Sequence, residues 1–123
     1  MIVSFLSMDE EKNKTFFQSE ATQHNNEIVF EDKSSLNTKI KLTFSEDMLI
    51  LERFGFIETK IHFCMDKLTQ GFYKSQDGLE FQFTVHTLQL CIEEMKFKAK
   101  YEMWMEEEKL STITFQVSLY ENA

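Results

Sequence analysis

The clearest pattern in the chain is the alternation of apolar and polar residues near its C-terminus. From residue 95 to residue 105, apolar side chains occupy every odd position, and charged side chains occupy most even positions. This two-residue period is typical of a half-buried antiparallel strand. The alternation resumes over 113–119, after a charged tip at 106–109. A helix over 95–106 would scatter the lysines around its circumference and bury no apolar stripe. The segment 95–119 is therefore predicted to form one long β-hairpin.

Turn residues divide the rest of the chain into further strands. The polar trio Ser45–Asp47 separates the alternating segment 40–44 from the apolar segment 48–56, which predicts a second hairpin. The dipeptide Asp77-Gly78 is a strong turn signal, between a strand that closes at 73–75 and the next strand. Strands are also predicted over Ile2–Leu6, Thr15–Ala21 and Glu27–Phe30, the last two joined by a turn at 24–26.

One predicted strand changes its buried face along its length. The apolar residues are at odd positions in its first half and at even positions in its second half: Leu79, Phe81, Phe83 and Val85, then Leu88, Leu90 and Ile92. Because successive side chains of a strand point to opposite faces, an extra residue near His86 and Thr87 would restore the register. We therefore predict a β-bulge at this point.

These patterns favour an all-β fold. Roughly eight to ten strands follow one another, and no helical period exceeds one turn. The chain has no proline and only 3 glycines, so no linker divides it, and we expect a single domain over 1–123. Sequential hairpins favour an antiparallel up-and-down barrel of about eight strands. A two-sheet β-sandwich is the alternative.

Charge and cysteine content limit the partners and the compartment. The chain carries 21 acidic and 13 basic residues, a formal net charge of −8. This charge opposes phosphate backbones and anionic lipids, so neither nucleic acid nor a membrane is an expected partner. The 2 cysteines are far apart, and no stretch resembles a signal peptide or a membrane span. We expect a reduced, cytoplasmic protein.

The middle of the chain resembles a known family. The residues that carry the resemblance are Arg53-Phe-Gly55, Phe63, Gly71-Phe-Tyr73-Lys-Ser75-Gln-Asp-Gly78 and Thr87-Leu88. Together they resemble the YwiB-like family of small uncharacterised proteins from Firmicutes, over about Thr38 to Leu90. Ser75 stands where threonine is expected, and residues 1–37 match only loosely. The resemblance implies a β-barrel with a lipocalin-like or calycin-like architecture and implies no activity.

Arg53 is the first candidate site residue, since it is the only arginine in the chain. Its position in the alternation places it on the apolar face with Leu49 and Leu51, where a charged group needs a partner. A structural interpretation pairs it with a carboxylate or with backbone carbonyls at the barrel mouth. A functional interpretation makes it a clamp for the carboxylate or phosphate of a small ligand.

The aromatic content suggests what lies inside the barrel. The chain has 13 Phe, 3 Tyr and 1 Trp, together with 7 Met. An eight-stranded barrel is wide enough either to be filled by such side chains or to hold one small ligand. For the second case, the candidate ligand-binding residues are Arg53, Phe63, Tyr73, Phe83 and Tyr101. The function expected is binding of a small apolar or amphipathic anionic molecule; the alternative is a non-catalytic protein-interaction module with a filled barrel.

Catalytic and metal motifs are not expected. His24, His62 and His86 lack a second ligand at metal-binding spacing on the same element, so no zinc motif and no cofactor is predicted. A three-dimensional site uniting His62 and Cys64 with His86 and Cys91 is geometrically conceivable. No nucleophile, base and orienting group can be named together, so an enzyme is not predicted.

Trp104 is a candidate interface residue. It shares its parity with Lys100 and Glu102 although its neighbours Met103 and Met105 are predicted to face inward. It should therefore lie on the outer face, either as a lone surface aromatic or as the anchor of a homodimer.

Overall fold

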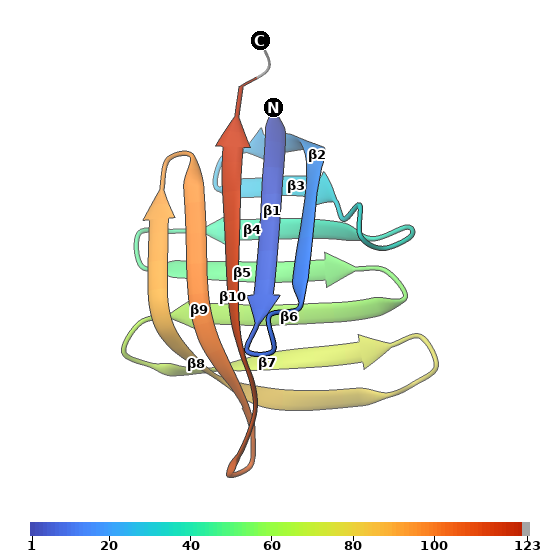
Figure 1. Ribbon diagram of the computed structural model, residues 1–123, viewed down its shortest axis with the longest axis vertical. Coiled ribbons are helices and arrows are strands. Elements are labelled where there is room, and N and C mark those ends of the chain that lie inside the picture. Colours follow the sequence, from blue (N-terminus) through green and yellow to red (C-terminus); the bar gives the residue numbers. More distant parts are fainter. Residues whose placement is uncertain (122–123) are drawn as a thin grey trace.

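The computed structural model describes residues 1–121, and between them it forms a closed antiparallel barrel of ten strands (Figure 1). The order around the barrel is β1-β10-β9-β8-β7-β6-β5-β4-β3-β2, so neighbours in sequence are neighbours in space and the first strand meets the last. The strands are β1 (Ile2–Asp9), β2 (Lys14–His24), β3 (Glu27–Glu31), β4 (Lys39–Phe44), β5 (Met48–Phe54), β6 (Ile57–Cys64), β7 (Leu68–Ser75), β8 (Glu80–Glu93), β9 (Lys96–Met105) and β10 (Glu108–Tyr120). No helix occurs over 1–121, hence none that could cross a membrane.

The predicted barrel and its hairpins are confirmed, and the strand count is ten instead of about eight. The hairpins over 39–54, 68–93 and 96–120 all form. Gly78 has a φ of 95° in the β7–β8 turn, a conformation that glycine adopts at no steric cost. The sequence pattern did not single out β6, because Thr59 occupies an inward position where an apolar residue would have marked the strand.

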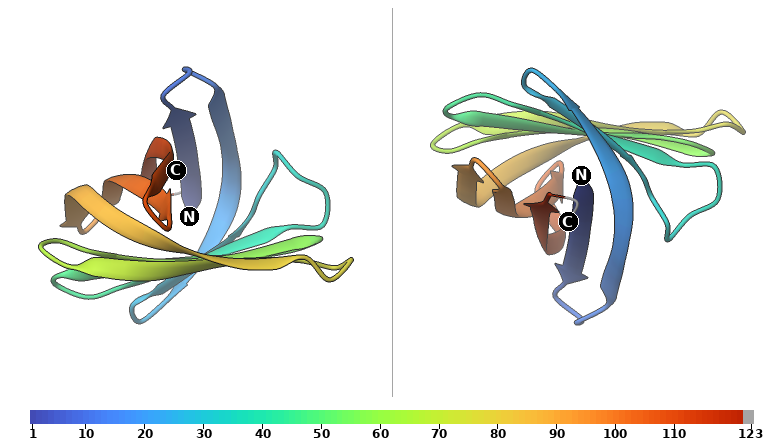
Figure 2. Two further views of the ribbon diagram at one scale, coloured as in Figure 1. Left: turned by 90° about the horizontal axis from the view of Figure 1, so that it is seen from below. Right: turned by 90° about the horizontal axis from the view of Figure 1, so that it is seen from above.

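Two long strands, β2 and β8, each pair with two different neighbours along their length and so belong to both layers of the barrel. Over 14–20, β2 pairs with β1, and over 21–24 it pairs with β3. Similarly, β8 pairs with β7 over 80–86 and with β9 over 84–93. Figure 2 shows the result as two layers, with β3–β7 in one and β9, β10 and β1 in the other. Their strands cross steeply in Figure 1. The barrel is therefore flattened, with its core between the layers.

The bulge predicted in β8 is present. The register between β8 and β9 shifts between Thr87 and Gln89, so Leu88 is the extra residue. Beyond it, Leu90 and Ile92 pack against the core while Gln89 is exposed. The bulge thus restores the apolar face and lies where β8 passes between the layers.

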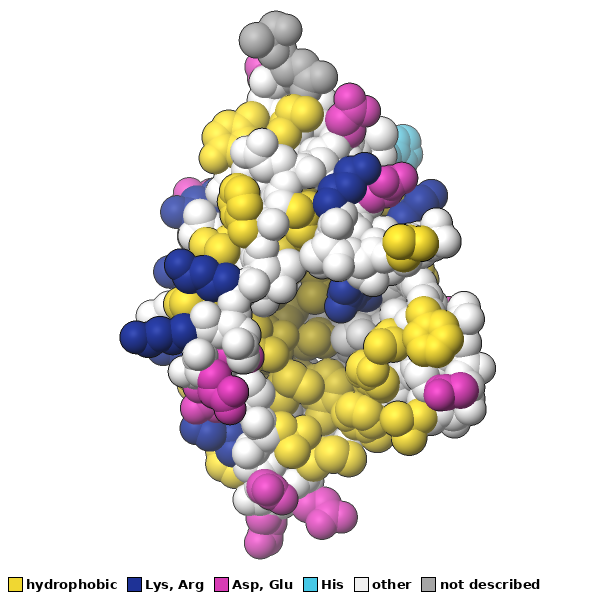
Figure 3. Space-filling view, turned by 45° about the vertical axis from the view of Figure 1, so that its right-hand side comes forward, with side chains coloured by type: hydrophobic (Ala, Val, Ile, Leu, Met, Phe, Trp, Pro, Cys, Tyr) yellow, Lys and Arg dark blue, Asp and Glu magenta, His cyan; other side chains and the backbone are white. Residues whose placement is uncertain are grey.

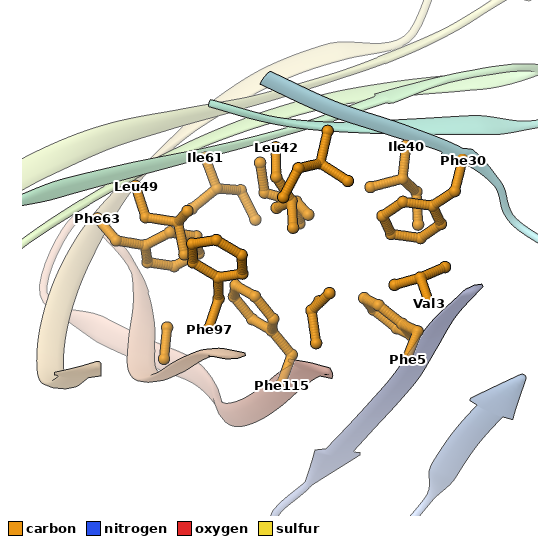
Figure 4. Packing of buried hydrophobic residues seen from close by; sticks show 14 of the residues in the cluster. Val3, Phe5, Phe30, Ile40, Leu42, Leu49, Ile61, Phe63, Phe97 and Phe115 are labelled. Carbon is orange, nitrogen blue, oxygen red and sulfur yellow. The ribbon is translucent and has the colours of Figure 1, made fainter. Parts of the chain in front are cut away.

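The core is aromatic and densely interlocked. Phe63 and Phe97 are fully buried, and Figure 4 shows both in the core near Leu49. The rings of Phe5 and Phe17 stack with their centroids 5.1 Å apart, and Phe63 meets Tyr101 edge-on at 4.7 Å. These rings fill most of the interior between β1, β6, β9 and β10. The space that remains lies toward one end of the barrel.

Candidate ligand-binding pocket

A pocket of about 260 Å³ extends into the barrel from the end where β3, β5 and β7 finish. Figure 3 shows a hollow with hydrophobic walls on the side of the molecule that carries the β3–β4, β5–β6 and β7–β8 connections. Apolar side chains from both layers form the wall: Phe5, Ile40, Leu51, Ile61, Phe83, Met103, Ile113 and Phe115. The polar lining residues are Ser7, Thr15, Asp32, Ser34, Arg53, Thr59, Tyr73 and Tyr101. The pocket is therefore apolar with polar groups at intervals, the usual composition of a small-molecule site.

Arg53 forms an ion pair with Asp32 at the pocket. Its Nε donates to Asp32 Oδ2 at 2.9 Å and its Nη2 donates to the same oxygen at 2.5 Å. The Asp32 side chain is 3% exposed and that of Arg53 is 36% exposed. This is the structural interpretation of Arg53 given above, and its partner is a carboxylate from the β3–β4 connection. Because the two charges cancel, the pair brings no net charge to the pocket.

Asp32 also shapes the loop that follows β3. Its Oδ1 accepts hydrogen bonds from the backbone N–H of Ser34, at 2.9 Å, and from the Ser34 hydroxyl. Its carbonyl accepts from the N–H of Ser35 at 3.2 Å, and its own N–H donates to the Thr38 carbonyl at 2.9 Å. The backbone and carboxylate of Asp32 thus hold the 32–38 loop together, and the carboxylate also ties the loop to Arg53 on β5, which fixes the loop as a wall of the pocket.

Tyr101 contributes a hydroxyl-bearing side chain to the pocket wall. The residue is 4% exposed and lines the pocket from β9. Among the described residues, the buried side-chain polar atom without a partner is Thr87 Oγ1, and the Tyr101 hydroxyl is not of this kind. Burial raises the pKa of Tyr101 above its ordinary value, so the hydroxyl keeps its proton and remains a donor. A protonated hydroxyl in the pocket wall can donate a hydrogen bond to an acceptor that enters the pocket.

Four of the five predicted ligand-binding residues line this pocket: Arg53, Tyr73, Phe83 and Tyr101. Their strands are β5, β7, β8 and β9, and the barrel register brings them to the same end. Phe63 does not line it. It is fully buried in the core, against Tyr101 and Phe115. Sequence reasoning did not name Asp32 and Ser34, because they lie in a loop whose position no periodicity predicts.

The remaining candidate residues lie elsewhere. His86 pairs with Glu102 at 3.1 Å, and Cys91 contacts Glu93 at 3.3 Å. Over 1–121, no three side chains drawn from His, Cys, Asp and Glu converge as metal ligands. Trp104 is half-buried, and its indole N–H donates to Glu102 at 3.3 Å. Its role as a homodimer anchor stays a prediction.

Comparisons with known proteins agree with this architecture. A family model described as "Domain of unknown function (DUF1934)" matches residues 2–117. The crystal structure of ywiB protein from Bacillus subtilis is similar with a TM-score of 0.58 and 16% sequence identity, over 98% of this chain and 89% of that chain. At this identity the likeness shows the fold alone. The search of curated proteins found no match.

Proposed function

The chain belongs to the DUF1934 family, and we propose that its barrel binds one small amphipathic molecule in the pocket around Arg53 and Tyr101. Binding of this kind inside an antiparallel barrel is lipocalin-like. The net charge of −8 and the two free cysteines support a cytoplasmic setting for it.

The observation that carries the proposal is the Tyr101 hydroxyl. It belongs to a pocket-lining residue that is 4% exposed, and burial keeps it protonated, so it can donate a hydrogen bond to a ligand. A bound acceptor, such as a carboxylate or carbonyl oxygen, would satisfy the hydroxyl and use its fixed position for specificity.

Arg53 supplies the second polar contact. An arginine has five N–H donors, and Asp32 takes one from Nε and one from Nη2. The Nη1 group and the second Nη2 proton remain for a ligand. Since Asp32 already balances the guanidinium charge, the geometry favours a head group with one negative charge or none over a dianionic phosphate.

The size of the pocket limits the body of the ligand. Its 260 Å³ lies just below the range of about 300–1,000 Å³ that holds drug-sized molecules. A long fatty acid would not fit within it. Phe5, Phe83 and Phe115 give it aromatic walls, against which a planar ring packs well. We therefore propose aromatic monocarboxylates and short-chain fatty acids as the first ligands to test.

The test is a thermal-shift panel confirmed by calorimetry. The panel contains aromatic monocarboxylates, short- and long-chain fatty acids, and isoprenoid phosphates. A ligand at a hundredfold excess over its Kd stabilises the native state by about 2.7 kcal/mol. Small monocarboxylates should raise the Tm, and both Tyr101→Phe and Arg53→Lys should weaken the effect. Tyr120→Phe is the matched control, because Tyr120 is 53% exposed and does not line the pocket. A panel without any shift, or a hit equally strong in all variants, would refute the proposal.

A protein-interaction role is the second candidate, supported by apolar residues around the same end of the barrel. Leu36, Phe54, Phe56 and Leu79 are 86%, 43%, 59% and 59% exposed, and all lie in or beside the connections at this end. Exposed apolar patches on a monomer often mark interfaces. Substituting Phe54 and Phe56 by serine should abolish partner binding if this role holds and leave the small-molecule shift intact.

A further inference from the structure

A cluster of soft donor side chains lies on the outer face of the β5–β6 hairpin. Met48 begins β5, and His62 and Cys64 end β6. Their neighbours Leu49 and Phe63 are fully buried in the core, so the alternation of the strands turns the three donors away from the core. All three are half-buried. They take no part in the pocket around Arg53.

The register of the hairpin brings the three donors together. Met48 lies directly opposite Cys64, so their Cβ atoms are about 4.5–5.5 Å apart. His62 is on the diagonal, and its Nε2 is in direct contact with the Met48 Sδ. Thr69 on β7 donates a hydrogen bond to the His62 carbonyl and holds this part of β6 in place. A thioether, an imidazole nitrogen and a thiol therefore share one small area of the sheet.

We propose that Met48, His62 and Cys64 form a binding site for a soft monovalent metal ion, Cu(I). Thioether and thiolate sulfur select Cu(I), and imidazole is also a good ligand for copper. Hard cations such as Mg²⁺ and Ca²⁺ need oxygen donors, which this cluster does not offer. On binding, the Cys64 thiol releases its proton to solvent, and the neutral imidazole presents the Nε2 lone pair to the metal.

The surroundings favour a cation. Glu46 and Asp47 immediately precede Met48, and Asp66 follows Cys64 by two residues, against a single nearby lysine in that turn, Lys67. These exposed carboxylates lower the electrostatic cost of bringing a positive ion to the hairpin end. They are not needed as ligands, because Cu(I) is commonly satisfied by two or three soft donors.

The chain contains its own control for this site. Cys91 is also half-buried on a strand, but its thiol contacts Glu93 and the residue opposite it on β9 is Lys98. His86 likewise pairs with a carboxylate, Glu102. Non-specific binding of copper to accessible thiols would therefore occur at Cys91 as well as at Cys64.

The test is an anaerobic competition titration of Cu(I) against a chromogenic chelator such as bicinchoninate. The intact protein should take up one Cu(I) with thiolate-to-copper absorption in the near ultraviolet. Cys64→Ser should abolish that band, and Met48→Leu, which keeps the side-chain volume, should weaken the affinity by about tenfold or more. Cys91→Ser should change neither. Circular dichroism of each variant verifies that the barrel is folded.

Three results would overturn the site. No uptake in competition with the chelator would exclude it, and equal losses in Cys64→Ser and Cys91→Ser would show non-specific thiol binding. An unchanged affinity in Met48→Leu would remove the thioether from the ligand set. Zn²⁺ titrated in parallel should bind more weakly than Cu(I), because only one thiol and one imidazole are present.

Discussion

Gly71 on β7 lies directly opposite Phe83 on β8, and the Phe83 ring occupies the space that a Cβ at position 71 would need. The ring is 3% exposed and forms part of the pocket wall. Replacing Gly71 by alanine would push the ring aside and strain the core. We expect a loss of about 1–3 kcal/mol in the free energy of unfolding, measured by urea denaturation.

A second substitution, Phe83→Leu, tests the same contact. On its own it should destabilise the barrel by removing ring contacts, but in the Gly71→Ala background it should recover part of the lost stability, since the smaller side chain leaves room for the methyl group. The double-mutant cycle should therefore show a favourable coupling of about 0.5 kcal/mol or more. Strict additivity would mean that the methyl group and the ring do not meet.

Arg53 and Asp32 should contribute to the stability of the fold as a coupled pair. Arg53→Met leaves the Asp32 carboxylate, which is 3% exposed, with Ser34 as its remaining partner. We expect a loss of about 1–3 kcal/mol, toward the low end for a buried pair because Arg53 is partly exposed. The double variant Asp32→Asn/Arg53→Met should lose less than the sum of the two single changes. Equal stabilities of Arg53→Met and the intact protein in chemical denaturation would contradict the role of this pair.

Stability at alkaline pH should depend on Tyr101. Burial raises its pKa in the folded state, so the folded protein keeps this proton at pH values where the unfolded chain loses it. The contribution of this proton to the free energy of unfolding is constant below the ordinary tyrosine pKa of about 10. It is lost as the pH rises above that value, by at most about 1.4 kcal/mol per pH unit. Tyr101→Phe should therefore flatten the alkaline decline and change little at neutral pH. Parallel alkaline curves for the variant and the intact protein would show that Tyr101 is not buried.

The bulge in β8 predicts which substitutions that strand tolerates. Leu90 packs against the core and Gln89 is exposed. Leu90→Ala should cost about 2 kcal/mol in the free energy of unfolding, since the side chain is only partly buried, whereas Gln89→Ala should cost less than about 0.5 kcal/mol. Thermal or urea unfolding measures both. The reverse order would place the register shift elsewhere.

Much of this barrel was predictable because its strands alternate cleanly. The β9–β10 hairpin and the parity change in β8 follow from residues that must face one core. The pattern weakens in β6 and β7, where Thr59, Thr69 and Gly71 occupy inward positions. Thr59 lines the pocket and Gly71 makes room for the Phe83 ring, so the part of the pocket wall that β6 and β7 form was the hardest to predict.

The part of the candidate site that lies on strands was predictable from the sequence, and the part that lies in a loop was not. Parity placed Arg53 on the inner face and indicated that it needs a partner, and the structure supplies Asp32. Nothing in the periodicity identifies that residue, because the loop 32–38 is positioned by hydrogen bonds of Asp32 and not by burial of a repeating face. Likewise, Met48 and Cys64 become neighbours only through the register of their hairpin.

The pairing of β1 with β10 determines when the barrel can be completed. Ile2 lies opposite Tyr120, and the N–H of Thr112 donates to the Glu10 carboxylate at 2.9 Å across nearly the whole chain. During synthesis, β1 has to wait for β10 to leave the ribosome before this seam can form, and until then β1 and the growing end of the meander expose unpaired edges. Contacts of such long sequence separation slow folding, because the entropy of a large loop is lost before the seam stabilises the sheet. The emergence of β10, and not the formation of the local hairpins, is therefore the event that permits closure, and the nascent chain is most prone to aggregate just before it.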